Sequence, residues 1–165
     1  MQKRGWVVVV AVACGVLVGG TGAGAQAPAT DPRLFAGSAD VKAMIARAKA
    51  ERKPDQPNFS QPIVALAPYS ANLEYRVGGL NAPASTHDKD AEMFYVVEGA
   101  GSVVTGGTLR DGKRTNAENA SGTGIDGGST RRIAVGDFIL VPPGTPHWFT
   151  QIDGVLVLMA LHLPK

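Results

Sequence analysis

The spacing of hydrophobic residues changes once along this chain, at a proline. Before it, apolar residues recur at intervals of three and four, namely at Val41, Met44, Ile45 and Ala48. This is the period of an amphipathic helix. Ser38 is placed to cap the first turn, and Pro54 ends the pattern because proline cannot continue a helix. We therefore expect one helix over about residues 39–53.

After this helix the pattern changes to short apolar or alternating runs, separated by turn residues. Leu73, Tyr75 and Val77 alternate with polar residues, as expected of a strand with two unlike faces. Further strands are expected over residues 62–69, 92–98, 102–108, 131–135, 137–141, 147–152 and 155–163. Many short strands at regular spacing favour an all-β fold, so we expect a barrel over about residues 58–163. Residues 109–130 are rich in Gly, Asn, Asp and Ser and predict a long irregular section.

The last expected strand is apolar at every position from Val155 to Leu161. A strand with one face in water alternates, so a continuous run implies that both faces are buried. One face can fill the barrel, but the other, together with Met93, Tyr95 and Val97, needs a further cover. The stripe of the expected helix is too narrow to cover both surfaces. We therefore expect a homodimer in which a second barrel packs face to face.

The first 25 residues carry the features of a secretory signal peptide. Lys3 and Arg4 form a positive start, residues 6–18 are apolar, and a small-residue A-x-A site ends at Ala25. Cleavage there predicts a secreted or periplasmic protein, with a flexible tether over residues 26–37 and a domain over 38–165. A membrane anchor and lipid attachment at Cys14 are the alternatives.

Charge and cysteine content exclude several classes of function. Loss of residues 1–25 removes two basic residues and no acidic one, so the formal charge of +2 becomes zero. A neutral domain without a basic stretch offers no electrostatic basis for nucleic-acid binding, and none for membrane binding after signal removal. Cys14 is the sole cysteine, which excludes an internal disulfide and a cysteine-rich zinc site.

Two spaced motifs contain the candidate chemistry. In the first, His87 is followed by four residues, Glu92, six residues and a glycine. In the second, Gly136 is followed by five residues, Pro142-Pro143-Gly144, two residues and His147. A G-x-G-x-x-G sequence at residues 122–127 lacks the helix that a dinucleotide site needs, because another strand follows it.

These two motifs resemble those of the cupin superfamily, and the resemblance covers residues 62–163. It implies a jelly-roll type antiparallel β-barrel, a single-domain protein with the helix packed outside. It also implies one divalent metal ion (Fe, Mn, Ni or Zn) held by His87, Glu92 and His147. Two positions depart from the family pattern: Ser85 stands where its first histidine falls, and Gln151 where its final asparagine falls.

The residues themselves favour a metal. Glu92 shares its strand face with Phe94 and Val96, and an ionised carboxylate inside an apolar barrel is costly unless it is paired or coordinated. Two imidazoles and one carboxylate form a triad that leaves coordination positions open. The alternative is a metal-free hydrogen bond between Glu92 and His147.

Other polar residues are assigned lesser roles. His162 lies in an apolar strand and is interpreted as a satisfied or surface histidine. Tyr95 lies three residues after Glu92, so we expect it to pack on the opposite face rather than act as a base. Asp88 and Asp90 are interpreted as turn residues that face solvent, with a supplementary role at the site as the alternative for either.

These features predict a metal-dependent cupin enzyme that acts on a small organic molecule inside the barrel. Isomerase, lyase or dioxygenase chemistry would each suit such a site. A non-catalytic small-molecule-binding module and a metal-free structural protein are the alternatives. No general base is identified.

Overall fold

The computed structural model of the protein describes residues 33–164. The signal peptide expected over residues 1–25 lies outside this range, as does most of the tether expected over residues 26–37. Within the part that is described, no helix is both long and apolar enough to cross a membrane.

The expected helix is present as α1 (Ser38–Glu51). It begins at Ser38 itself, because Gly37 rather than Ser38 is the N-cap residue. The Gly37 N–H donates to Asp40 Oδ2 at 2.8 Å, and this carboxylate also suits the positive end of the helix dipole. Met44 and Ala48 are the buried residues of α1, so the helix contacts the barrel along one narrow stripe.

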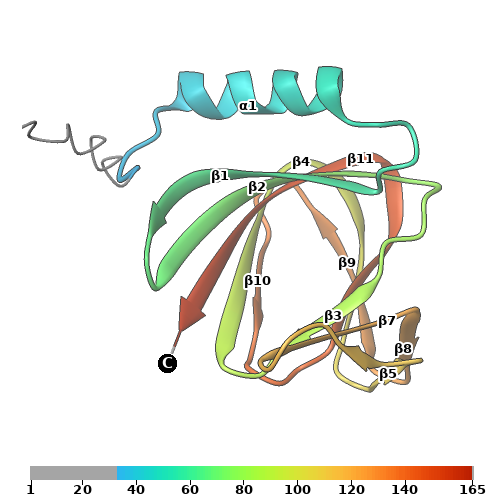
Figure 1. The fold of residues 1–165 in the computed structure, drawn as a ribbon. Coiled ribbons are helices and arrows are strands. Elements are labelled where there is room, and N and C mark those ends of the chain that lie inside the picture. The colour runs from blue at the N-terminus through green and yellow to red at the C-terminus, as the bar shows by residue number, and fades with distance from the viewer. Residues whose placement is uncertain (1–32, 165) are drawn as a thin grey trace, which may run out of the picture. The chain divides into compact units, whose positions relative to one another are not determined.

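Eleven antiparallel strands follow the helix. They are β1 (Asn58–Leu66), β2 (Tyr69–Val77), β3 (Ala84–His87), β4 (Asp90–Thr105), β5 (Thr108–Arg110), β6 (Lys113–Arg114), β7 (Asn119–Gly122), β8 (Gly124–Asp126), β9 (Ser129–Ala134), β10 (Phe138–Val141) and β11 (His147–Pro164). Nine belong to one sheet, while β5 and β8 form a separate pair. The predicted all-β barrel with one helix outside is confirmed (Figure 1).

Two strands are longer than the sequence suggested. Glycine-containing turns at residues 99–101 and at Gly154 were expected to divide each into two strands, and this expectation was wrong. Instead β4 and β11 pair from His147↔Thr105 to Pro164↔Asp90, with register shifts around Ile152. Positive φ angles at Gly99 (78°) and Gly154 (72°) let each strand bend without ending.

The section expected to be irregular, residues 109–130, contains most of β5–β8. The β5–β8 pair covers one outer face of the barrel, where Ile125 packs with Ala84 and Val104. The residues of the G-x-G-x-x-G sequence lie on β7 and β8 and in adjoining turns, without a following helix. The rejection of a dinucleotide site from the sequence therefore agrees with the structure.

The barrel interior and the space under α1 form two separate cores. The interior core consists of Phe94, Val96, Val103, Ile133, Ile139, Val141, Phe149, Leu156, Leu158 and Ala160. Beneath α1, Leu73, Tyr75 and Val157 pack against Met44 and Ala48. The apolar face of β2 therefore points outward to the helix, and its polar face points into the barrel.

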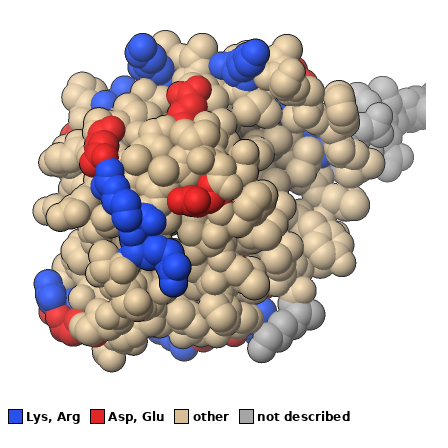
Figure 2. Space-filling view, turned by 180° about the vertical axis from the view of Figure 1, so that it is seen from behind, with Lys and Arg blue, Asp and Glu red and all other residues tan. Residues whose placement is uncertain are grey.

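The described residues leave two apolar surfaces exposed, one on and beside β10 and another that includes Leu66, Tyr69 and Leu163. On and beside β10, Val135, Phe138 and Leu140 are 62%, 68% and 61% exposed. The ring of Tyr95 on β4 packs against Phe138, with 4.6 Å between centroids. Figure 2 shows the molecule from behind: a row of Lys and Arg side chains lies beside a few acidic ones on a largely uncharged face.

Gly79 and Gly99 have the same φ of 78°. Comparing alanine substitutions at the two positions therefore separates the cost of backbone strain from the cost of a steric clash. Replacing Gly79 with alanine meets nothing within 4 Å, whereas a Cβ at Gly99 would lie 1.8 Å from the Val155 carbonyl oxygen. We expect Gly79→Ala to lower the free energy of unfolding by about 1–2 kcal/mol. Gly99→Ala should cost about 1–3 kcal/mol beyond that, because β11 must shift. Denaturant titration of both variants measures the difference, and equal losses would contradict the close pairing of β4 and β11 at Gly99.

Candidate metal centre

The candidate ligands come from three strands that the fold brings together. His87 ends β3, Glu92 lies near the start of β4, and His147 begins β11. His147 pairs with Ser85 of β3, and Glu92 pairs with His162 near the end of β11. Because β4 and β11 bend, residues from opposite ends of β11 reach the same carboxylate.

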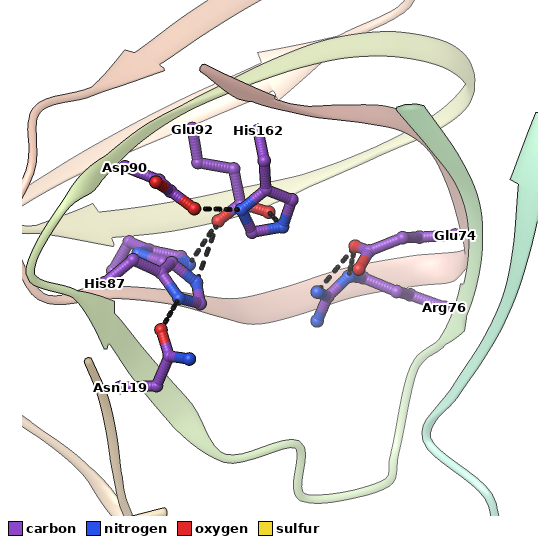
Figure 3. Close-up of polar contacts among 8 residues, drawn as sticks. Glu74, Arg76, His87, Asp90, Glu92, Asn119 and His162 are labelled. Atoms are coloured by element: carbon purple, nitrogen blue, oxygen red, sulfur yellow. Dashed lines mark hydrogen bonds and ion pairs between the residues drawn. The ribbon is translucent and has the colours of Figure 1, made fainter. Parts of the chain in front are cut away.

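The three residues named from the sequence form a compact cluster, of which Figure 3 labels His87 and Glu92. The Nε2 atoms of His87 and His147 each lie 3.2 Å from Glu92 Oε2. One ligand atom from each residue lies within 4.8 Å of the others, which is suitable spacing for a common metal ion. Glu92 and His147 are only 4% and 5% exposed, while His87 is half-buried.

Asn119 orients His87, a role that the sequence did not reveal. Its Oδ1 lies 2.7 Å from His87 Nδ1. A carbonyl oxygen only accepts hydrogen bonds, so this contact favours a proton on Nδ1. In that tautomer of the neutral ring, the lone pair of Nε2 faces Glu92. Metal-binding histidines are commonly held this way by a second partner. No local signal marks Asn119, because the β3–β7 pairing brings it to His87 from 32 residues away.

The Glu92 carboxylate has an unfilled bonding position. Oε2 is buried and has no hydrogen bond with acceptable geometry, although two imidazole nitrogens lie 3.2 Å away. In the neutral ring, His87 Nε2 and Glu92 Oε2 are both acceptors, so they need a cation between them. A divalent metal fits this donor set. His147 Nδ1 is also buried without a partner, and nothing in the structure explains it.

The same contacts shift the pKa values of the cluster. The contact with Glu92 raises the pKa of His87 above 6.5, against the opposing effect of burial. For Glu92, burial favours the neutral form, but the contacts with His147 and His87 outweigh it and hold the pKa well below its usual range. The cluster therefore keeps a negative charge that a proton on His87, or a metal, can neutralise.

His162 lies beside the cluster, although the sequence suggested a satisfied or surface position. Its Nε2 is 3.5 Å from Glu92 Oε1, its Nδ1 is 3.7 Å from Asp90 Oδ2, and its side chain is 25% exposed. Its ring stands edge-on to His87 at 5.1 Å between centroids. Antiparallel pairing of β4 with β11 sets His162 opposite Glu92, and no motif in the sequence marks this pairing. Asp90 therefore faces the site rather than solvent alone.

The remaining candidate residues take the positions that the sequence suggested or lie further away. Ser85 is half-buried on the same strand as His87. Tyr95 packs outside the barrel against Phe138, which leaves it away from the cluster. Asp88 pairs with Arg114 at 2.5 Å on the surface.

The family is shown by sequence comparison. The family model described as Cupin matches residues 62–162, which contain every strand from β2 to β10 and all three candidate ligands. The chain therefore belongs to the cupin family. No curated protein matches the sequence significantly.

Solved structures show the same fold at low identity. The DMSP lyase DddQ from Ruegeria pomeroyi is 18% identical, with a TM-score of 0.54 over 82% of this chain and 68% of that chain. BH2720 from Bacillus halodurans is also 18% identical, with a TM-score of 0.53 over 82% and 85% of the two chains. TT1209 from Thermus thermophilus is 16% identical, with a TM-score of 0.52 over 72% and 93%. At these identities the likeness shows the fold alone.

The raised pKa of His87 is testable in chelator-treated protein. We expect the imidazole of His87 to titrate above 6.5, because Glu92 stabilises its protonated form. Glu92→Gln should lower that pKa, since the neutral amide no longer attracts the imidazolium. Asn119→Ala should lower it by a smaller amount. NMR of the imidazole nitrogens over about pH 5–9 measures each value, and an unchanged His87 pKa in Glu92→Gln would show that the two side chains are not in contact in solution.

Proposed function

We propose that this cupin binds one divalent metal ion through His87, Glu92 and His147, and acts as a metal-dependent enzyme on a small organic molecule. The observation that supports this most strongly is the buried Oε2 of Glu92, which lacks a hydrogen-bond partner and lies 3.2 Å from Nε2 of both His87 and His147. The N-terminal segment supports action in the periplasm or outside the cell, after cleavage near Ala25.

The site suits isomerase or lyase chemistry on an oxygen-bearing molecule. A bound divalent ion would act as a Lewis acid that polarises such an oxygen. Three protein ligands leave coordination positions free for that molecule. The side chains of His87 and His162 are 21% and 25% exposed, so the cluster is reachable from solvent. The cupin fold carries lyase activity in the Ruegeria protein named above.

Metal uptake tests the proposal directly. Protein stripped with chelator and titrated with Fe²⁺, Mn²⁺, Ni²⁺ or Zn²⁺ should bind about one ion per chain. His87→Ala, Glu92→Ala and His147→Ala should each abolish or severely weaken binding. Asn119→Ala should weaken it by about 10- to 100-fold, as is typical for partners that orient a ligand.

Metal affinity should fall as pH is lowered through the raised pKa of His87, because the proton competes with the metal for Nε2.

The matched control for these variants is His162→Ala. His162 contacts Glu92 Oε1 but lies outside the compact group of three, so its loss should weaken binding less than loss of His87 or His147. Wild-type affinity in all three ligand variants would show that the ion binds elsewhere. Failure of the wild type to take up any of the four metals would leave only the metal-free alternative.

We also propose that a second copy of the chain covers the apolar patch of Val135, Phe138 and Leu140. Association through it should bury at least about 1,000 Å² in total and should persist at high salt, because apolar burial drives it. Light scattering should give the mass of a dimer at micromolar concentration. Phe138→Glu should give a monomer, while Leu66→Glu, at a 50% exposed position on β1, should not. A monomeric wild type would refute the proposal.

A further inference from the structure

The interior face of β2 carries a charged pair that the metal cluster does not use. Glu74 and Arg76 stand opposite Leu158 and Leu156 of β11, both members of the interior core. Their side chains are only 13% and 12% exposed. Figure 3 shows the pair facing the same interior space as the histidine cluster. Ser70 and Asn72, also half-buried, continue this polar face along β2.

A buried ion pair such as this one is weak evidence of a contribution to stability. Arg76 donates from Nε and Nη2 to Glu74 Oε2 at 2.9 and 2.7 Å, and its guanidinium lies 4.5 Å from the ring centre of Phe149. Replacing a buried ion pair with apolar side chains is often neutral or stabilising. The interior is otherwise lined with leucine, valine and phenylalanine, so a role in ligand binding would account for charges at these two positions.

The pair leaves part of Arg76 free. Both of its hydrogen bonds go to one oxygen of Glu74, and Nη1 has no hydrogen bond to any of the described residues. A guanidinium whose plane is fixed on one edge presents its other donors in a set direction. Carboxylates match this arrangement well, because two parallel N–H donors can reach their two oxygens.

The charges of the barrel interior also favour an anion. Glu74 and Arg76 neutralise each other, and Glu92 offsets one charge of a divalent ion at the cluster. Asp90 faces the site from its edge, with a side chain that is 35% exposed and therefore partly hydrated. Among the buried groups alone, one positive charge of the ion then remains if the histidines are neutral. A negatively charged ligand would compensate it, whereas a neutral ligand would leave it unpaired at a cost.

We propose that Arg76 anchors the carboxylate of a small organic acid whose second oxygen donor lies at the metal cluster. Glu74 is a positioning residue that holds the guanidinium plane against Phe149. This inference rests on the proposed metal centre and names the class of its ligand: organic acids with two oxygen-bearing groups.

Calorimetry on the metal-loaded protein tests the ligand class, with malonate, succinate and glutarate as probes and malonamide and succinamide as neutral counterparts. The wild type should bind at least one dicarboxylate and neither diamide. Arg76→Gln should weaken dicarboxylate binding by about tenfold or more, the usual effect of losing a hydrogen bond to a charged group. Metal affinity, measured first for each variant, should stay within about threefold of the wild type.

Because Arg76→Gln leaves Glu74 partly buried without its partner, a second variant keeps the test decisive. Glu74→Gln combined with Arg76→Gln removes both charges at similar volume, and should fold and bind metal but lose dicarboxylate binding to the same degree. Lys89→Gln is the matched control, because it removes a positive charge from a side chain that is 68% exposed and pairs with Glu118. It should leave binding unchanged.

The possible failures are distinguishable. Equal dicarboxylate affinity in the wild type and in the double variant would overturn the role of Arg76 while the metal centre stands. The same holds if no dicarboxylate binds the metal-loaded wild type, or if the diamides bind equally well. A wild type that takes up no metal would instead overturn the proposed function on which this inference rests.

Discussion

The candidate metal centre depends on the burial of one carboxylate. Glu92 is 4% exposed and lies on the interior face of β4, beside Phe94 and Val96. An ionised carboxylate in such surroundings costs several kcal/mol unless it is compensated. The two imidazoles that reach Oε2 lie near enough to share a cation with it, but do not satisfy it by hydrogen bonding. The surrounding residues can therefore be understood as supplying that compensation.

The bent strands make this arrangement possible. A straight strand of 18 residues such as β11 would separate His147 from His162 by the length of the barrel. Because β11 and β4 bend together near Gly154 and Gly99, both histidines reach the same carboxylate. The cluster thus joins the two halves of the barrel, and the glycines that permit the bend also help to position the candidate ligands.

The three candidate ligands could be selected from the sequence because motif spacing is a local property, and the fold brings the three side chains together. The motif spacing identified His87, Glu92 and His147, and period-two alternation placed Tyr95 outside the barrel. The strand lengths were missed because glycines that usually mark turns here mark bends, and only the pairing with a neighbouring strand separates the two cases.

Long-range placement was the other part that the sequence did not reveal. Asn119 and His162 reach the cluster only through strand pairing, and neither belongs to a motif. The alternation of β2 was recognised, but which of its faces points inward depends on where α1 packs. The alternation of polar and apolar residues along β2 could therefore not predict that Glu74 and Arg76 are buried. Their burial is nevertheless the basis for the inferred ligand class.

The most direct test of the central claim is the position of a bound metal. Anomalous diffraction at the absorption edge of the ion, from crystals of protein loaded with one of the four metals, locates it without assumptions about the fold. We predict a single peak at about 2.0–2.2 Å from His87 Nε2, His147 Nε2 and a carboxylate oxygen of Glu92, the range for nitrogen and oxygen ligands. A cluster with no peak in metal-loaded crystals, or a peak bound only by surface residues, would contradict the account.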